Sequence, residues 1–256
     1  MGSEPTTKIE RPRSVAEIIG EALDTYQRYP LLFIILALGV IAPYELVVLA
    51  VTGHGPLVNQ SHETPTTQVI LIVLDSALVG PLVSALYVHA VTLIGEGRRP
   101  RLGEVAARGL RVLPEVSAAV IVSSLGILLG FLALIVPGII LFLRWAVVAQ
   151  VAAIERQGWL PALRRSAELT RGNYLHVLGV LVVAGLLAAG FTVLAGALPL
   201  GSTSGALSVA VGIAARTIAA SFGALALALL YFDLRARAAG PSEPAPSDYE
   251  PPSGGE

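Results

Sequence analysis

Four ionisable residues lie inside long apolar stretches of the sequence: Glu45, Asp75, Arg144 and Arg216. A charged side chain at the centre of a bilayer costs ~2.5 to 3.5 kcal/mol even on insertion scales, so such residues usually face the interior of a helix bundle. Counted at 1.5 Å per residue, all four lie roughly 8 to 16 Å from the outer ends of their segments. Acids and bases at similar depth predict ion pairs. We expect Arg216 to bind Asp75, and Arg144 to bind either of the two carboxylates.

A second set of polar residues follows a heptad spacing through the second apolar stretch: Gln68, Asp75, His89 and Glu96. On an ideal helix this spacing keeps Asp75 and His89 within ~40° of each other. Proton relays and solute paths have this form. Separate polar groups that are each satisfied by neighbouring helices have it too, and we favour this interpretation because Pro81 interrupts the helix between them.

The sequence shows no catalytic arrangement, and we expect neither enzymatic activity nor a cofactor or metal. The chain has no cysteine, which excludes disulfides, thiolate metal sites and cysteine nucleophiles. The serine-rich segment 201–205 lacks the spacing of a nucleophile elbow. His54, His62 and Glu63 could hold a metal, but two histidines eight residues apart are a weak signal.

The composition is that of an integral membrane protein. Hydrophobic residues make up 54% of the 256 residues and charged residues only 14%, and the mean hydropathy is +0.74, far from a soluble domain. The net charge of -1 gives no reason to expect a nucleic-acid partner. Arginine supplies all but one of the seventeen basic residues, which with abundant alanine, glycine and valine suggests a GC-rich bacterial genome and a bacterial plasma membrane.

Six stretches are long and apolar enough to cross a membrane. A span needs about 20 residues at 1.5 Å rise to cross a hydrocarbon core of ~30 Å. We therefore predict an all-α, polytopic bundle of six transmembrane helices at 14–237, with disordered termini at 1–13 and 238–256. The predicted spans are 31–52, 67–95, 116–136, 139–154, 174–198 and 205–232.

Basic residues set the orientation of these spans, because Lys and Arg gather on the cytoplasmic side. Fifteen of the seventeen lie near the termini, between spans two and three, or between spans four and five. The alternate connections, 53–66, 137–138 and 199–204, carry none. The pattern places both termini in the cytoplasm and leaves Arg144 and Arg216 as the two exceptions.

Three cytoplasmic segments have the apolar periodicity of amphipathic helices: 15–26, 102–113 and, more weakly, 159–170. Ser14 and Glu17 have the spacing of a capping box at the start of the first segment. Each segment precedes a pair of spans, so we predict three units of one interfacial helix and one hairpin. The basic residues of these helices are expected to contact anionic lipid headgroups, and each contributes ~1 kcal/mol to the attraction to the membrane surface.

Three segments carry a resemblance to a known family: VPGIILFLRWAVVAQVAAIE at 136–155, LRRSAELTRG at 163–172 and LYFDLR at 230–235. With AEIIGEALDTY at 16–26, they make the chain resemble the YciC-type bacterial membrane proteins and the membrane domain of glycerophosphoryl diester phosphodiesterases. The resemblance implies a six-span accessory domain of largely unknown function. In the phosphodiesterases a separate soluble domain carries the chemistry, and its metal-binding carboxylates and paired histidines are missing from this sequence. The matching residues are Pro137, Gly138, Arg144, Glu155, Ser166, Thr170, Gly172, Tyr231, Asp233 and Arg235.

We therefore expect a non-enzymatic, accessory or scaffolding membrane protein that associates with lipids. The alternative is a small-solute or ion transporter or channel that uses the four intramembrane charges. The expected partners are anionic headgroups on the cytoplasmic side, together with a protein partner or a second copy of the chain. Gly126 and Gly130 form a GxxxG pattern, which we attribute to packing inside the bundle rather than to dimerisation.

Overall fold

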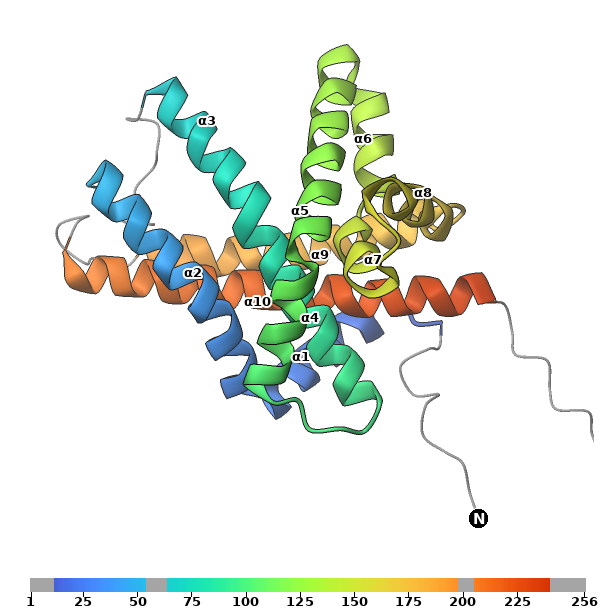
Figure 1. Cartoon of the computed structure of the whole chain (residues 1–256), viewed down its shortest axis with the longest axis horizontal. Coiled ribbons are helices and arrows are strands. Elements are labelled where there is room, and N and C mark those ends of the chain that lie inside the picture. The colour runs from blue at the N-terminus through green and yellow to red at the C-terminus, as the bar shows by residue number, and fades with distance from the viewer. Residues whose placement is uncertain (1–11, 54–63, 198–204, 240–256) are drawn as a thin grey trace, which may run out of the picture.

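The computed structural model describes residues 12–53, 64–197 and 205–239. In these ranges the chain is all-α, without strands, and six helices are long and apolar enough to span a membrane, as predicted (Figure 1). In chain order the elements are α1 (Val15–Arg28), α2 (Pro30–Thr52), α3 (Pro65–Leu74), the π-helix η2 (Asp75–Val79), α4 (Gly80–Gly95), α5 (Leu102–Ala133), α6 (Ile135–Arg144), α7 (Val148–Glu155), α8 (Trp159–Thr170), α9 (Tyr174–Gly196) and α10 (Ala206–Ala239).

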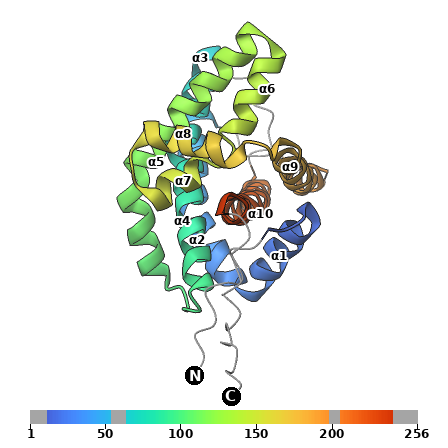
Figure 2. The same ribbon diagram turned by 90° about the vertical axis from the view of Figure 1, so that its right-hand side faces the viewer.

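The longest helix, α10, is the element on which most of the others pack. It contacts α9, α4, α2 and α1, and Figure 2, in which α10 is seen nearly end-on, shows these helices around it. From Ala224 to Ala236, all side chains of α10 are buried except Leu227 and Arg235, which are partly exposed. The core therefore lies around the C-terminal half of α10. The more peripheral helices keep many large apolar side chains exposed, as expected for surfaces that face lipid.

The second span is interrupted midway by the π-helix η2. Pro81, near the start of α4, has no N–H with which to continue an α-helical ladder, and local π-helical turns re-satisfy the backbone groups that a proline frees in a membrane span. Accordingly, the N–H of Gly80 donates to the carbonyl of Asp75, five residues earlier. Asp75 thus lies at the junction of two helical segments rather than inside a uniform span.

The fourth span differs from the prediction at its start and in its middle. The turn predicted at 137–138 lies instead at Leu134, which has extended backbone between α5 and α6. Pro137 and Gly138 belong to the start of α6, where proline is tolerated because the first N–H groups of a helix have no partner within it. The span then breaks a second time at residues 145–147, between α6 and α7.

Two of the three predicted interfacial helices are separate elements, α1 and α8. The capping box of α1 is confirmed: Ser14 N–H donates to Glu17 Oε2 at 2.7 Å, and Glu17 N–H donates to Ser14 Oγ at 3.2 Å. The third, 102–113, is the first part of the 32-residue α5 and continues into the span without a break. Part of its apolar stripe packs on the bundle, since Val105 is buried and Gly109 lies directly against Leu86 of α4, whereas Leu102 and Leu110 are exposed.

The glycines of the GxxxG pattern in α5 pack inside the α5–α6 hairpin, as the sequence predicts. A Cβ atom added at Gly126 would lie 2.5 Å from the ring of Trp145, and one added at Gly130 would lie 3.1 Å from the Cα of Gly138. These two glycines therefore let α6 and the following turn approach α5 closely.

Candidate functional site

Three of the intramembrane charges meet where α2, η2 and α10 cross. Arg216 of α10 donates from Nη1 to Oε1 of Glu45 on α2, and from Nη2 to Oδ1 of Asp75 at the start of η2. The pairing of Arg216 with Asp75 is the one that the sequence predicts. We call Glu45, Asp75 and Arg216 the membrane triad. It ties together three helices that are far apart in the sequence.

The triad is only partly enclosed. The side chain of Glu45 is 4% exposed, whereas those of Arg216 and Asp75 are 32% and 39% exposed. The guanidinium also lies over the ring of Tyr44, 5.1 Å from its centroid, and Tyr44 is fixed by a 3.1 Å hydrogen bond from its hydroxyl to the carbonyl of Leu71. With all three groups ionised, two carboxylates face one guanidinium, and the triad has a net charge of one negative unit.

Arg144 is not part of this cluster, so its predicted pairing with Glu45 or Asp75 is wrong. It is the last residue of α6, and its side chain is exposed. The prediction counted depth along a straight fourth span, but the break at 145–147 ends α6 at Arg144, and α6 packs on α5, α8 and α9. Its carbonyl instead accepts hydrogen bonds from the side chains of two residues on α8, Ser166 at 2.9 Å and Thr170 at 3.3 Å.

The heptad-spaced polar residues of span two are not joined to one another. Asp75 belongs to the membrane triad, while His89 Nδ1 bonds the carbonyl of Ala85 on its own helix at 2.7 Å. Glu96 is exposed and pairs with Arg98 at 3.6 Å, and Gln68 is half-buried near the start of α3. The η2 turn changes the helical phase between Asp75 and His89. This arrangement favours separate polar groups over a continuous track.

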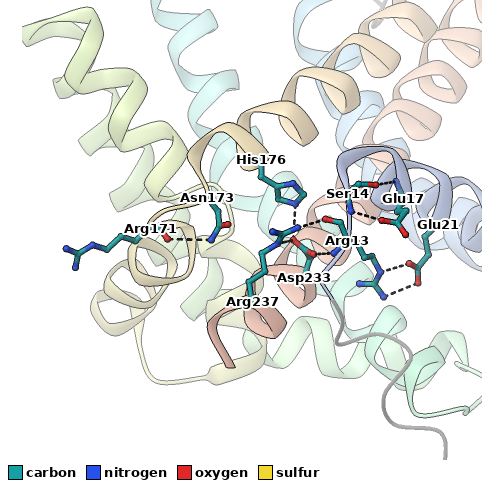
Figure 3. A network of polar contacts seen from close by, with 9 residues as sticks. All are labelled: Arg13, Ser14, Glu17, Glu21, Arg171, Asn173, His176, Asp233 and Arg237. Atoms are coloured by element: carbon teal, nitrogen blue, oxygen red, sulfur yellow. Dashed lines mark hydrogen bonds and ion pairs between the residues drawn. The ribbon is translucent and has the colours of Figure 1, made fainter. Parts of the chain in front are cut away.

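A second buried cluster, centred on Asp233 near the C-terminal end of α10, joins three parts of the chain (Figure 3). The carboxylate of Asp233 is fully buried. It accepts hydrogen bonds from the backbone N–H of Arg13 at 2.5 Å and from Nε of Arg237 at 2.8 Å, and it lies 2.9 Å from Nε2 of His176 on α9. Arg237 also donates to the carbonyl of Arg13, so the segment before α1 is held on α10.

The Asp233 cluster brings together residues whose contacts the sequence does not predict. The sequence predicts that Arg13 belongs to a disordered terminus, yet it is 1% exposed and its Nε lies 2.6 Å from Oε2 of Glu21. The capping box at Ser14 is the available signal, because it requires ordered chain one residue after Arg13. The remaining residues of the predicted disordered termini, 1–11 and 240–256, lie outside the described ranges.

The other family-like residues hold α6, α7 and α8 onto the bundle. Glu155, at the end of α7, accepts a hydrogen bond from the buried hydroxyl of Tyr231 at 3.3 Å and lies 3.5 Å from Nε of Arg165. Arg235 lies over the Tyr231 ring at 5.8 Å. Gly172 follows α8 with a φ of +81°, a left-handed conformation that favours glycine. These contacts hold helices against one another, which is a structural role.

No group of three or more His, Asp or Glu side chains in the described ranges is arranged to hold a metal ion. The metal candidates His54, His62 and Glu63 lie outside those ranges, as do residues 201–204 of the serine-rich segment.

Comparison with known proteins shows similarity to bacterial membrane proteins. The chain is 30% identical over 120 residues to the UPF0259 membrane protein of Yersinia pestis (strain Pestoides F), which covers 44% of this chain and 46% of that protein. The UPF0259 membrane protein of Yersinia pseudotuberculosis serotype O:3 (strain YPIII) matches to the same extent. The chain thus spans about half the length of the curated relatives it matches. No protein-family profile matches the sequence, and no solved structure matches it.

Proposed function

We propose that the protein is a non-enzymatic accessory or scaffolding component of the bacterial plasma membrane that associates with anionic lipids through its cytoplasmic face. Its likeness to uncharacterised membrane proteins, and its resemblance to YciC-type proteins and to a membrane domain whose chemistry resides elsewhere, agree with this role. The observation that carries the proposal is the surface of α8.

Helix α8 combines apolar anchors with basic side chains. Trp159 and Leu160 at its start are 44% and 42% exposed, and Arg164 on the same helix is exposed, as are the flanking Arg156 and Arg171. A short helix of this kind lies in the plane of a membrane surface, with the apolar side chains at the acyl boundary and the arginines among the headgroups. Anionic lipids would then bind on this side.

Arg144 fits the same surface. Its carbonyl is bonded to Ser166 and Thr170, so the end of α6 lies at the level of α8. In the proposed orientation, Arg144 joins the arginines of the cytoplasmic face. Arg216 is then left as the basic residue inside the spans.

Lipid retention tests this proposal. The protein, stripped of lipid in detergent, is offered phosphatidylglycerol and phosphatidylcholine in equal amounts, and native mass spectrometry counts the lipids that stay bound. We expect phosphatidylglycerol to be preferred, and the double variant Arg164→Gln/Arg171→Gln to weaken its binding about fivefold for each arginine, the equivalent of ~1 kcal/mol per charge. The control is Glu168→Gln, which removes a single charge of the opposite sign at an exposed position of α8 and should not weaken binding. Equal retention of both lipids would contradict the proposal.

A transporter or channel is the second candidate, and one observation favours it. A cavity of about 170 Å³ reaches Asp75 and Arg216 of the membrane triad. Flux of ions or small solutes into proteoliposomes tests this function. Flux that is lost in Asp75→Asn but kept in Arg164→Gln would support it and would count against a purely accessory role.

A further inference from the structure

The cavity beside the membrane triad is elongated and has a charged end. One wall is formed by α10, from Arg216 through Ala220 and Ala224 to Leu227, a stretch of roughly 16 Å at 1.5 Å per residue. The opposite wall is formed by η2 and α4, and Ile41 of α2 completes the lining.

The volume suits a small organic molecule. A water takes up about 30 Å³ of liquid, and a wholly apolar engineered cavity of about 150 Å³ is known to bind benzene. The cavity here is about 170 Å³, so it has room for a ring or a short chain with one polar group. Seven of its ten lining residues are apolar, which favours a ligand with an apolar body.

The charge of the triad sets the sign of the polar group. Each carboxylate uses one oxygen on the guanidinium, Oε1 of Glu45 and Oδ1 of Asp75. Oδ2 of Asp75 makes no hydrogen bond within the described ranges, and Asp75 lines the cavity with a side chain that is 39% exposed. An ammonium group at Oδ2 would bring the triad from one negative unit to neutrality. An anion would meet the excess negative charge.

A bare metal ion fits less well. Hard cations such as Ca²⁺ and Mg²⁺ take six or more oxygen ligands, whereas the only side-chain oxygens that line the cavity, among the described residues, are those of Asp75 and Ser84. Those two residues are nine positions apart along the second span, roughly 13 Å on a helix. The Ser84 hydroxyl makes no hydrogen bond in the described ranges and is available to a polar atom at the far end of a ligand.

We propose that this cavity is a binding site for a small organic monocation, an amine whose ammonium group binds Asp75 Oδ2 and whose apolar body lies between α10 and α4. Binding of this kind requires neither transport nor the lipid contacts of α8. The ammonium could belong to a free amine or to the headgroup of an aminophospholipid that reaches the cavity.

The test uses the full chain in phosphatidylcholine nanodiscs, with benzylamine as the cationic probe and benzyl alcohol and benzoate as neutral and anionic probes of similar shape. Binding is followed by the shift in unfolding temperature and by ligand-observed NMR. We expect a response to benzylamine alone. Ala220→Leu, which fills the cavity and leaves the charges of the triad in place, should weaken binding about tenfold or more, as should Asp75→Asn. Ala214→Leu, on the exposed face of α10, is the matched control and should bind as the parent does.

A parallel arm replaces part of the phosphatidylcholine by phosphatidylethanolamine and measures the lipid retained on purification. A response to benzylamine without selective retention of phosphatidylethanolamine assigns the site to free amines. Retention that is lost in Ala220→Leu, without a response to benzylamine, assigns it to the lipid ammonium. Equal binding of benzyl alcohol and benzylamine, binding that Ala220→Leu leaves unchanged, or no response in either arm would overturn the proposal.

Discussion

The membrane triad and the Asp233 cluster lie at opposite ends of α10, and they solve the problem of a buried charge in opposite ways. At Asp233, one fully buried carboxylate is met by two hydrogen-bond donors and a histidine nitrogen, and its charged neighbours Arg13, Arg237 and Glu21 bring the cluster to balance when His176 is neutral. At Arg216, one guanidinium serves two carboxylates and an excess negative charge remains.

This difference in charge compensation distinguishes a cluster that stabilises the fold from a candidate binding site. A buried polar network that is fully satisfied rigidifies the fold and leaves no group for a ligand. The Asp233 carboxylate has this form, because both of its oxygens are engaged by the Arg13 N–H, His176 or Arg237, and it fixes the N-terminal segment on α9 and α10. The membrane triad is partly exposed, holds an unused carboxylate oxygen and adjoins a cavity. These features make it the candidate binding site of the two.

The largest expected loss of stability follows from Asp233→Asn. The substitution takes the charge from a fully buried carboxylate that binds the partly exposed guanidinium of Arg237 and the backbone N–H of Arg13, and breaking a pair with a buried member typically costs about 3 to 5 kcal/mol. Unfolding of the detergent-solubilised protein by heat or denaturant measures the loss. Glu168→Gln, which removes an exposed carboxylate next to Arg165, is the control and should change stability by less than ~1 kcal/mol. Similar losses of stability in the two variants would show that the Asp233 cluster does not stabilise the fold.

Arg216→Leu should cost less, about 2 to 3 kcal/mol in the same unfolding assay, because its guanidinium is one-third exposed and screening weakens the pair. The loss arises mainly at Glu45, whose buried carboxylate is left without a cation. A variant as stable as the parent would mean that the triad does not hold the three helices together.

Gly126→Ala tests packing away from both clusters. The added methyl group would press on the ring of Trp145, and such overpacking costs about 1 to 3 kcal/mol. Gly185→Ala on α9, where nothing lies within 4 Å of the new Cβ, is the matched substitution and should be neutral or stabilising by up to ~1 kcal/mol. The difference in unfolding temperature between the two variants is the measurement, and equal temperatures would contradict the assigned role of Gly126.

Arg144→Leu should have the smallest effect, within ~0.5 kcal/mol, because the side chain is exposed and no carboxylate binds it in the described part of the chain. The thermal unfolding curves of Arg144→Leu and Arg216→Leu, recorded side by side, give the comparison. A loss at Arg144 as large as that at Arg216 would indicate a carboxylate partner for Arg144.

Hydropathy and local sequence patterns predict the six spans, the capping box at Ser14 and the ion pair of Arg216 with Asp75. They do not predict the position of Arg144, because depth counted along the sequence assumes straight helices, whereas the chain breaks at 134 and at 145–147, where Gly126 and Gly130 of α5 lie against Trp145 and Gly138. The η2 turn, which precedes Pro81, changes the phase of the predicted polar track.

The Asp233 cluster could not be predicted because its contacts join residues 220 positions apart in sequence. One partner of Asp233 is a backbone N–H, which has no signature in residue type. The local part, Arg237 four residues after Asp233 on one helix, has a recognisable spacing. The capping box likewise indicates order beside Arg13, but neither signal says that the two segments meet.

A pair of double-mutant cycles tests most directly that Arg216, and not Arg144, is the partner of the buried carboxylate of Glu45. Free energies of unfolding are measured for Arg216→Leu, Arg144→Leu, Glu45→Gln and the two combinations with Glu45→Gln. We expect a coupling energy of about 1 to 3 kcal/mol between Arg216 and Glu45 and none, within ~0.5 kcal/mol, between Arg144 and Glu45. A coupling to Arg144 that equals or exceeds the coupling to Arg216 would contradict the membrane triad.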